Sequence, residues 1–424
     1  MGNSFRQTIA SIFSNPKMKE DILLSGHLKE TIIRSQEANG EYLLIAQDTT
    51  SYNYTGHKQM EGLGVIQQKT LGIHQHNAMV MNELGTPLGL IHQEYWSRSN
   101  EVASTNKAYD GIESQKWFRG LSAVNNHLST ITKKKVLIQD READIYDFFT
   151  AKREENVALI TRVCQPRNLT LAEIKTTFKL ATIGEHLTDY GTKTITINRN
   201  NKEVNVVLSI KASPVSILAG QGKTKTVCKG MSLVIAEEIV ENIATTTATP
   251  QVSETSETTE TANNIAPKDK IIWYLLTSLP VENQEDALRV ITFYSFRWRI
   301  ERLHYTLKSG GYNVERLQFD DIQTTINALV FYSVVSWQLL MISYLVKEDK
   351  EYAPEVAFSK QEVEILQALT NKQILTLKIA VLSIAKFVKF VPTKKQPMPG
   401  IKIMAEALER FYYIKMGFQQ GRKQ

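Results

Sequence analysis

Two short apolar runs that each end at an aspartate place the strongest constraint on the fold of this chain. The first, "EYLLIAQDTT", contains Asp48, and the second, "KKKVLIQDREADIYDFF", contains Asp140. Short apolar runs bounded by polar residues are typical of strands buried in a sheet. The second run leads into a helix whose first turn is acidic. We therefore expect both aspartates at the edge of a cleft, where core strands of a mixed sheet end.

The remaining pattern predicts further strands and then helices, so the predicted fold class is α/β. "HNAMVMNELGTPLGLIHQEYW" holds two strand-like runs around Gly85-Thr86-Pro87, which is a hairpin signal. Beyond Arg162, "KTITINRNNKEVNVVLSIKA" alternates around Asn200-Asn201 and predicts a second hairpin. "GMSLVIAEEIV" and "KIIWYLLTSLP" continue the strand character. From about residue 352 the pattern is helical, and the chain ends basic.

Two segments depart from this texture. The stretch from about 243 to 268 is low-complexity Thr, Ser and Glu, a composition that predicts a disordered loop inside the β-rich section. Residues 322–346 carry no charge and are long enough to span a bilayer. Several polar residues interrupt them and a strongly basic helix precedes them, so the pattern favours a buried core helix over a membrane span.

Composition bounds the class of protein. The chain has 424 residues, of which 42% are apolar, so it can bury a large core and hold two or three domains. A net charge of +6 permits a polyanionic partner without identifying one. Cys164 and Cys228 match no zinc or disulfide pattern, which suits a reducing cytoplasm.

One predicted helix, "FYSFRWRIERLHYTLKSGG", surrounds a single acid with basic residues. At about 100° per residue, Tyr294, Arg297, Glu301 and Lys308 form one stripe roughly 60° wide. An apolar stripe lies beside it and would face a core. The plain alternative is an amphipathic helix whose Arg297 and Glu301 pair at i,i+4, worth about 0.3–0.5 kcal/mol. That alternative leaves the excess of positive charge unexplained.

Asp48, Asp140 and Glu301 together form a candidate catalytic set. Three converging carboxylates suit Mg²⁺, with Mn²⁺ as a substitute, because hard divalent cations take oxygen ligands. Two such ions about 3.5–4 Å apart would activate a water or a 3′-hydroxyl and stabilise the leaving oxygen in phosphodiester transfer. Taken alone, each residue has a plainer role, and Asp140 would serve as a helix cap.

The cations around Glu301 then acquire a function. A phosphodiester substrate brings negative charge, and Arg297 and Lys308 would hold the phosphates that flank the scissile one. Tyr294 would hydrogen-bond a phosphate oxygen. The acid of this helix would thus bind a metal, and its basic residues would bind DNA.

These residues resemble the DDE transposases of bacterial insertion sequences, in the IS-four group that includes the transposon Tn-five enzyme. The signature of that group is Tyr-x2-Arg-x3-Glu-x6-Lys, and the stripe described above matches all four positions. "QDTT" followed by "YTGH", then "ESQKW" and "DREADIY", are similar to further blocks of the family in the same order. The resemblance covers roughly residues 41–345.

The resemblance implies an RNase H-like core interrupted by a β-rich insertion domain. We accordingly expect a short helical remnant at 1–40, core at 41–163 and 273–346, insertion at 164–272 and a helical C-terminal region at 347–424. It also implies a Mg²⁺-dependent endonuclease of the nucleoid that nicks transposon ends, forms a hairpin intermediate and joins them to target DNA as a homodimer.

Two further residues take roles only from the resemblance. Trp273 in "WYLLTS" matches a tryptophan that stacks on a flipped base near the hairpin, a contact worth about 1–3 kcal/mol. The alternative for Trp273 is an ordinary core residue of a strand. Arg162, at the end of "VALITR", resembles an arginine near the DNA in the active site.

The chain also departs from the family pattern. The family usually carries an N-terminal helical domain that reads the terminal inverted repeat, and Asp48 lies too early in the sequence for one, as in a truncated copy. Tyr305 stands where the Tn-five enzyme has a lysine, so one phosphate contact would be lost. The sequence therefore leaves open a catalytically idle DNA-binding remnant that inhibits transposition, and an RNase H-like nuclease that cuts without joining.

Overall fold

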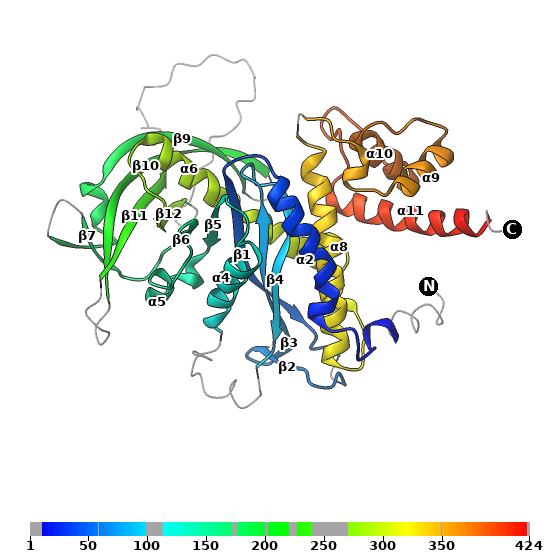
Figure 1. Cartoon of the computed structure of the whole chain (residues 1–424), viewed down its shortest axis with the longest axis horizontal. Coiled ribbons are helices and arrows are strands. Elements are labelled where there is room, and N and C mark those ends of the chain that lie inside the picture. The colour runs from blue at the N-terminus through cyan, green and yellow to red at the C-terminus, as the bar shows by residue number, and fades with distance from the viewer. Residues whose placement is uncertain are drawn as a thin grey trace, which may run out of the picture. The chain divides into compact units, whose positions relative to one another are not determined.

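The structure is a computed structural model that describes residues 11–57, 59–98, 113–171, 176–199, 202–219, 227–239, 270–348 and 350–421. The chain divides into two compact units. The first unit contains Met1–Gln139, Ala151–Ala158 and Ser295–Gln424, and the second contains Asp140–Thr150 and Leu159–Tyr294. Figure 1 shows mixed α/β architecture with helices at the C-terminal end, as the sequence predicts. The predicted Thr/Ser/Glu loop and the Asn200-Asn201 turn lie outside the described residues.

The sheet of the first unit is built around β1. Its strands are β1 (Tyr42–Asn53), β2 (Gly64–Gln67), β3 (Thr70–Met81), β4 (Pro87–Trp96) and β5 (Lys134–Gln139). β1 pairs antiparallel with β3 and parallel with β5, while β2 and β4 both pair antiparallel with β3. The run from Leu43 to Ala46 is completely buried. The strand that contains Asp48 and the β3–β4 hairpin are therefore confirmed. The predicted strand end at Asp48 is wrong, because pairing with β3 carries β1 on to Asn53, whereas Asp140 does follow the end of β5 directly.

The two faces of this sheet contact different helices. His76 on β3 packs edge-to-face against Trp117 of α4 (Gln115–His127), with ring centres 4.8 Å apart. Its neighbour Gln75 points to the other face and donates to Ser333 of α8 (Ile322–Leu345) at 2.9 Å. Because successive side chains of a strand alternate between faces, β1 presents Gln47 to α4 and Asp48 to the opposite side.

The uncharged segment is α8, and most of its residues are buried inside the first unit. This helix is long and apolar enough to cross a membrane. The core helices of soluble proteins can have the same length and hydropathy. Two of the polar side chains of α8 have partners in the unit: Ser333 accepts from Gln75, and the Asn327 amide donates to the carbonyl of Phe13 at 2.8 Å. α8 also packs beside α2 (Glu20–Glu37), as Figure 1 shows.

Other helices of the first unit are short or C-terminal. They are α7 (Trp298–Tyr305), the π-helical turn η4 (Thr306–Gly310), η5 (Val314–Arg316), η6 (Pro354–Val356), α9 (Lys360–Thr370), α10 (Leu377–Ala385), η7 (Lys386–Val388) and α11 (Ile401–Gly421). α9 begins with a capping box in which Ser359 and Glu362 each satisfy a backbone amide of the other. The helical C-terminal region is thus as predicted.

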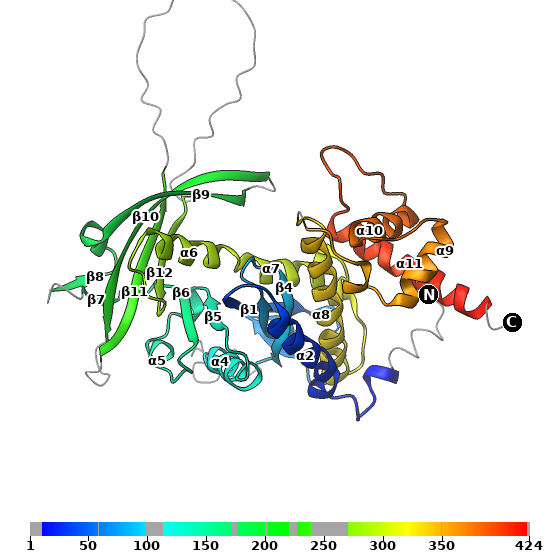
Figure 2. The same cartoon turned by 45° about the horizontal axis from the view of Figure 1, so that its top comes forward.

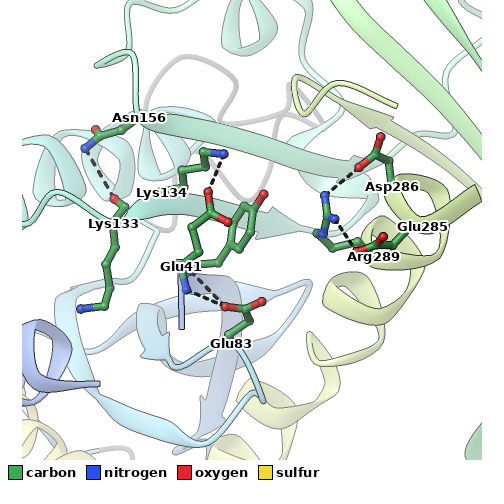
Figure 3. Close-up of polar contacts among 9 residues, drawn as sticks. Glu41, Glu83, Lys133, Lys134, Asn156, Glu285, Asp286 and Arg289 are labelled. Carbon is green, nitrogen blue, oxygen red and sulfur yellow. Dashed lines mark hydrogen bonds and ion pairs between the residues drawn. The ribbon is translucent and has the colours of Figure 1, made fainter. Parts of the chain in front are cut away.

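A charged cluster fixes where β1 begins. The Glu83 carboxylate accepts from the backbone amides of Glu41 and Tyr42, at 2.7 and 3.3 Å (Figure 3). This approach needs a glycine at Gly40, because its φ of +95° is unfavourable for other residues and a Cβ there would collide with Glu83. Lys134 at the start of β5 pairs with Glu41 at 2.7 Å. The strand that leads to Asp48 is therefore held at its first residue.

The second unit is rich in antiparallel strands. From Leu159 onward it contains β6 (Val157–Arg162), β7 (Asn168–Leu171), β8 (Thr177–Lys179), β9 (Thr188–Arg199), β10 (Lys202–Leu218), β11 (Val227–Glu238) and β12 (Ile272–Thr277). The order is β6-β12-β11-β10-β7-β8, with β9 paired to β10 (Figure 2). The hairpin predicted around residues 200 and 201 is confirmed by the β9–β10 pairing.

The short helical elements of this unit are η1 (Arg141–Ala143), α5 (Tyr146–Phe149), η2 (Ile183–His186) and α6 (Gln284–Ser295). In the first turn of α6, Arg289 pairs with Asp286 at 2.8 Å and with Glu285 at 3.2 Å (Figure 3). Glu285 is largely exposed, so its i,i+4 pair with Arg289 stabilises the helix only modestly, whereas Asp286 and Arg289 are partly buried.

The packing of α2 on β4 can be tested with two glycines. A Cβ added at Gly89 on β4 would collide with the side chain of Thr31 on α2, whereas one at Gly26 on α2 would meet nothing within 4 Å. Gly89→Ala should cost about 1–3 kcal/mol through overpacking. Gly26→Ala should be neutral or stabilise by up to about 1 kcal/mol through helix propensity. Urea denaturation of both variants checks this, and equal stabilities would contradict the close α2–β4 contact.

Candidate active site

A buried arginine joins two of the predicted carboxylates. Arg297, directly before α7, places Nη2 2.5 Å from Glu301 Oε1 and Nη1 4.0 Å from Asp48 Oδ2. The side chain of Arg297 is only 7% exposed, and that of Asp48 only 15%. The half-exposed ring of Trp298 covers the guanidinium at 4.9 Å. Residues about 250 positions apart in the sequence thus share one cation, and we call Asp48, Arg297 and Glu301 the carboxylate–arginine cluster.

A histidine and an asparagine hold Asp48 from its other side. The Asn77 side-chain oxygen accepts from Gln75 at 2.9 Å and from Gln93 at 3.1 Å, so its amide nitrogen is left to donate to His304 Nε2 at 3.0 Å. A neutral imidazole that accepts at Nε2 carries its proton on Nδ1. Nδ1 lies 3.6 Å from Asp48 Oδ2. The β1–β3 register, which pairs Asp48 with Asn77, creates this arrangement.

The surroundings of the two carboxylates shift their pKa values in opposite directions. Burial alone would raise the pKa of Asp48, but its interaction with His304 and the charge of Arg297 outweigh burial, and the pKa is lowered. Burial raises the pKa of Glu301; Arg297 opposes this rise, and the negative charge of Asp48 adds to it. One guanidinium therefore does not fully compensate two carboxylates.

The fourth signature residue lies on the same face of β1. Lys308, in the π-helical turn η4, places Nζ 5.6 Å from the centre of the Tyr52 ring. Tyr52 follows Asp48 by four residues on the strand, so both side chains point to one face. Burial lowers the pKa of Lys308, and the charge of Glu315 acts against this change.

The predicted single helix over the signature is wrong. α6 ends at Ser295 and α7 begins at Trp298. Between them the backbone tightens, because Arg299 and Ile300 bond carbonyls three residues back, at 3.0 and 3.1 Å. Tyr294 therefore belongs to the second unit, while Arg297 belongs to the first. The helical spacing of about 100° per residue still predicts correctly that Arg297 and Glu301 lie together, because this pair spans a single turn.

Besides Tyr294, three predicted site residues lie in the second unit. Asp140 accepts from the backbone amide of Glu142 at 2.9 Å and caps η1, which is the plainer role the sequence left open. Arg162 on β6 donates to the carbonyl of Ile272 at 3.1 Å. Trp273 on β12 is buried, and its ring meets that of the equally buried Tyr294 edge-to-face at 4.9 Å. The meeting of Asp140 with Asp48 and Glu301, and the contacts of these side chains with DNA, stay predictions.

The donor chemistry of the cluster fits a divalent cation. Asp48 and Glu301 offer hard carboxylate oxygens, and their mutual repulsion would be relieved by a positive charge between them. Among the residues that the structure describes, no three His, Cys, Asp or Glu side chains are grouped so that they could hold a metal ion. That Asp140 supplies a third ligand stays a prediction from the sequence.

Sequence reasoning missed His304 and Asn77. His304 follows Glu301 by three residues, so helical spacing offered a signal that it shares the same side of α7. Asn77 gave no such signal, because its place beside Asp48 depends on the pairing register of two strands.

Comparison with known proteins adds little to this picture. No family model matches the chain. Among solved structures, a piggyBac transposase synaptic complex with hairpin DNA, determined by cryo-electron microscopy, is similar over 90% of this chain, with 9% sequence identity and a TM-score of 0.35. The match spans 62% of that chain's length. At this TM-score the likeness carries no argument about fold or activity.

Replacing each carboxylate separately should change stability in opposite directions. Because the pKa of Glu301 is raised, the folded state binds this proton more tightly than the unfolded chain, and ionising Glu301 opposes folding. Glu301→Gln should raise the melting temperature at pH 7, with the gain vanishing below the usual pKa of 4.5. Asp48→Asn should lower it at pH 7, because folding stabilises the charged form; this loss should disappear only below 3.8.

Thermal melts in a metal chelator between about pH 3 and 8 check both variants. Opposite signs at pH 7 support the shared guanidinium. Equal signs would contradict this charge arrangement.

Proposed function

We propose that this chain is a DDE transposase that performs cut-and-paste DNA transposition. The observation that carries the proposal is the carboxylate–arginine cluster. The aspartate that ends the first apolar run lies about 250 positions before the arginine and glutamate of the signature, yet the three side chains lie together with their charges coupled. Such a meeting is what a metal-dependent phosphodiester site needs, and an ordinary amphipathic helix gives no reason for it.

The residues would divide the work as follows. Asp48, Glu301 and Asp140 would hold Mg²⁺ or Mn²⁺, which when bound supplies charge stabilisation at the phosphate and lowers the pKa of a ligated water. Arg297 orients Glu301 through its 2.5 Å contact, and His304, itself fixed by Asn77, orients Asp48. Arg297 and Lys308 would bind the phosphates on either side of the scissile one.

The finer steps belong to the same proposal. They are an RNase H-like core, a nick at each transposon end, a hairpin intermediate, transfer to target DNA, and a homodimer on DNA in the nucleoid. Trp273 would stack on a flipped base and Arg162 would lie near the DNA. Tyr294 would hydrogen-bond a phosphate oxygen. Since the rings of Trp273 and Tyr294 are buried against each other, the stacking by Trp273 and the phosphate contact of Tyr294 both require these rings to separate when DNA binds.

The test uses the purified protein and a duplex that ends in the inverted repeat flanking its gene. With Mg²⁺ or Mn²⁺ added, gels should resolve nicked, hairpin and joined products. Glu301→Gln and Asp140→Ala should each lower the cleavage rate by at least about 10²-fold, because each removes a ligand of the metal. Glu285→Gln, which alters a largely exposed glutamate of α6, serves as the matched control.

Other results would favour a different function for this chain. Cleavage that survives Glu301→Gln would refute the proposal. Metal-dependent nicks without any joined product would favour an RNase H-like nuclease. Binding to the repeat without cleavage would favour the DNA-binding remnant that inhibits transposition.

A further inference from the structure

The loop between α10 and α11 gathers positive charge that the proposed reaction does not use. From 386 to 402 the sequence contains five lysines and no aspartate or glutamate. We call this segment the lysine loop. All five side chains are exposed. Figure 2 shows the connection between α10 and α11 extending away from these helices. The lysines are Lys386, Lys389, Lys394, Lys395 and Lys402.

The lysine loop has a defined conformation. The backbones of Thr393 and Gln396 exchange two hydrogen bonds, at 3.1 and 3.2 Å, which closes a tight turn with Lys394 and Lys395 at its tip. At its base, the ring of Phe387 stacks in parallel on that of Phe411 in α11, 6.3 Å between centres. The backbone is thus fixed at the tip and at the base of the loop, which lowers the part of the ordering cost of binding that comes from the backbone.

The charge of the loop is not compensated within the described part of the first unit. None of the five lysines forms an ion pair there, whereas other bases on α11 do. Lys415 pairs with Glu362 at 2.7 Å, and Arg410 lies 3.6 Å from Glu406. Neighbouring cations without counter-charges repel one another and attract a polyanion.

The side chains favour a phosphate backbone over a membrane surface. Peripheral membrane segments insert aromatic side chains beside their lysines. In the lysine loop, Phe387 packs on Phe411, Phe390 is only partly exposed, and Val391 is the one aliphatic residue that is largely exposed. Lysine acts as a point charge toward phosphate and reads no base edge in a fixed geometry.

We propose that the lysine loop binds the phosphate backbone of duplex DNA without regard to sequence, as a contact made by residues outside the carboxylate–arginine cluster. This inference rests on the proposed function for the identity of the polyanion. The lysine loop would suit flanking or target DNA, which the protein must bind whatever the base sequence of that DNA.

The experiment measures the salt dependence of binding by the full-length protein to a fluorescent random-sequence duplex of about 30 base pairs. Each phosphate contact contributes about 0.9 to the slope of log K against log salt concentration. Replacing Lys386, Lys389, Lys394 and Lys395 by Gln together should therefore reduce the slope by about 3 to 4 and weaken binding more than about tenfold near 0.1 M salt.

The matched control removes the same charge from four exposed lysines elsewhere: Lys29, Lys152, Lys179 and Lys229. It should leave the slope within about 1 of the wild-type value. Melting temperatures verify that both variants fold, and Lys394→Glu with Lys395→Glu should weaken binding further than the matching Gln pair.

Glu301→Gln separates this inference from the proposed function, since it should abolish cleavage and leave the slope unchanged. Equal slopes for the loop variant and the matched control would overturn the inference. So would absence of duplex binding by the wild-type protein, or lysine-dependent binding to vesicles of anionic phosphatidylserine in place of DNA.

Discussion

The buried contact of Arg297 with two carboxylates is the interaction on which the rest of the candidate site depends. A guanidinium that is almost completely removed from water must be compensated by negative charge close to it. Asp48 and Glu301 supply that compensation from β1 and α7. The requirement fixes the position of the start of α7 over the strand, and with it the direction in which Glu301 points. The site is therefore held in place by the charges that would do its chemistry.

Because side chains alternate between the two faces of the sheet, the residues that surround Asp48 come from one face of two neighbouring strands. One face of β1 and β3 carries Asp48, Asn77 and Gln75. Gln75 donates to Asn77 and Ser333, Asn77 bonds His304, and His304 lies 3.6 Å from Asp48. Such a buried network rigidifies what it connects, because any displaced member strands a polar group away from water. The orientation of Asp48 is in this way set by residues that would never touch a substrate.

Sequence reasoning succeeded where the signal is local. The strand that contains Asp48, both hairpins, the buried α8 and the helical C-terminal region follow from periodicity and turn residues alone. The proximity of Arg297 and Glu301 follows from one helical turn. The interruption before Trp298 could not be predicted, because neither glycine nor proline marks it; burial of Arg297 against a distant strand accompanies it. The roles of Asn77 and His304 likewise depend on strand register and tertiary packing, which no window of sequence contains.

The π-helical turn at Thr306–Gly310 carries a consequence for how the signature should be recognised in other chains. A π turn accommodates about one residue more than the α turn it replaces. The interval between Glu301 and Lys308 is therefore the spacing of an interrupted helix. In this turn each residue advances the chain around the axis by less than the 100° of an α-helix, so the extra residue is absorbed within Thr306–Gly310. A search that assumes regular α-helical spacing between the glutamate and the lysine would therefore misplace the lysine around the axis. The interval of seven residues carries Lys308 to the ring of Tyr52 through a turn that is π-helical.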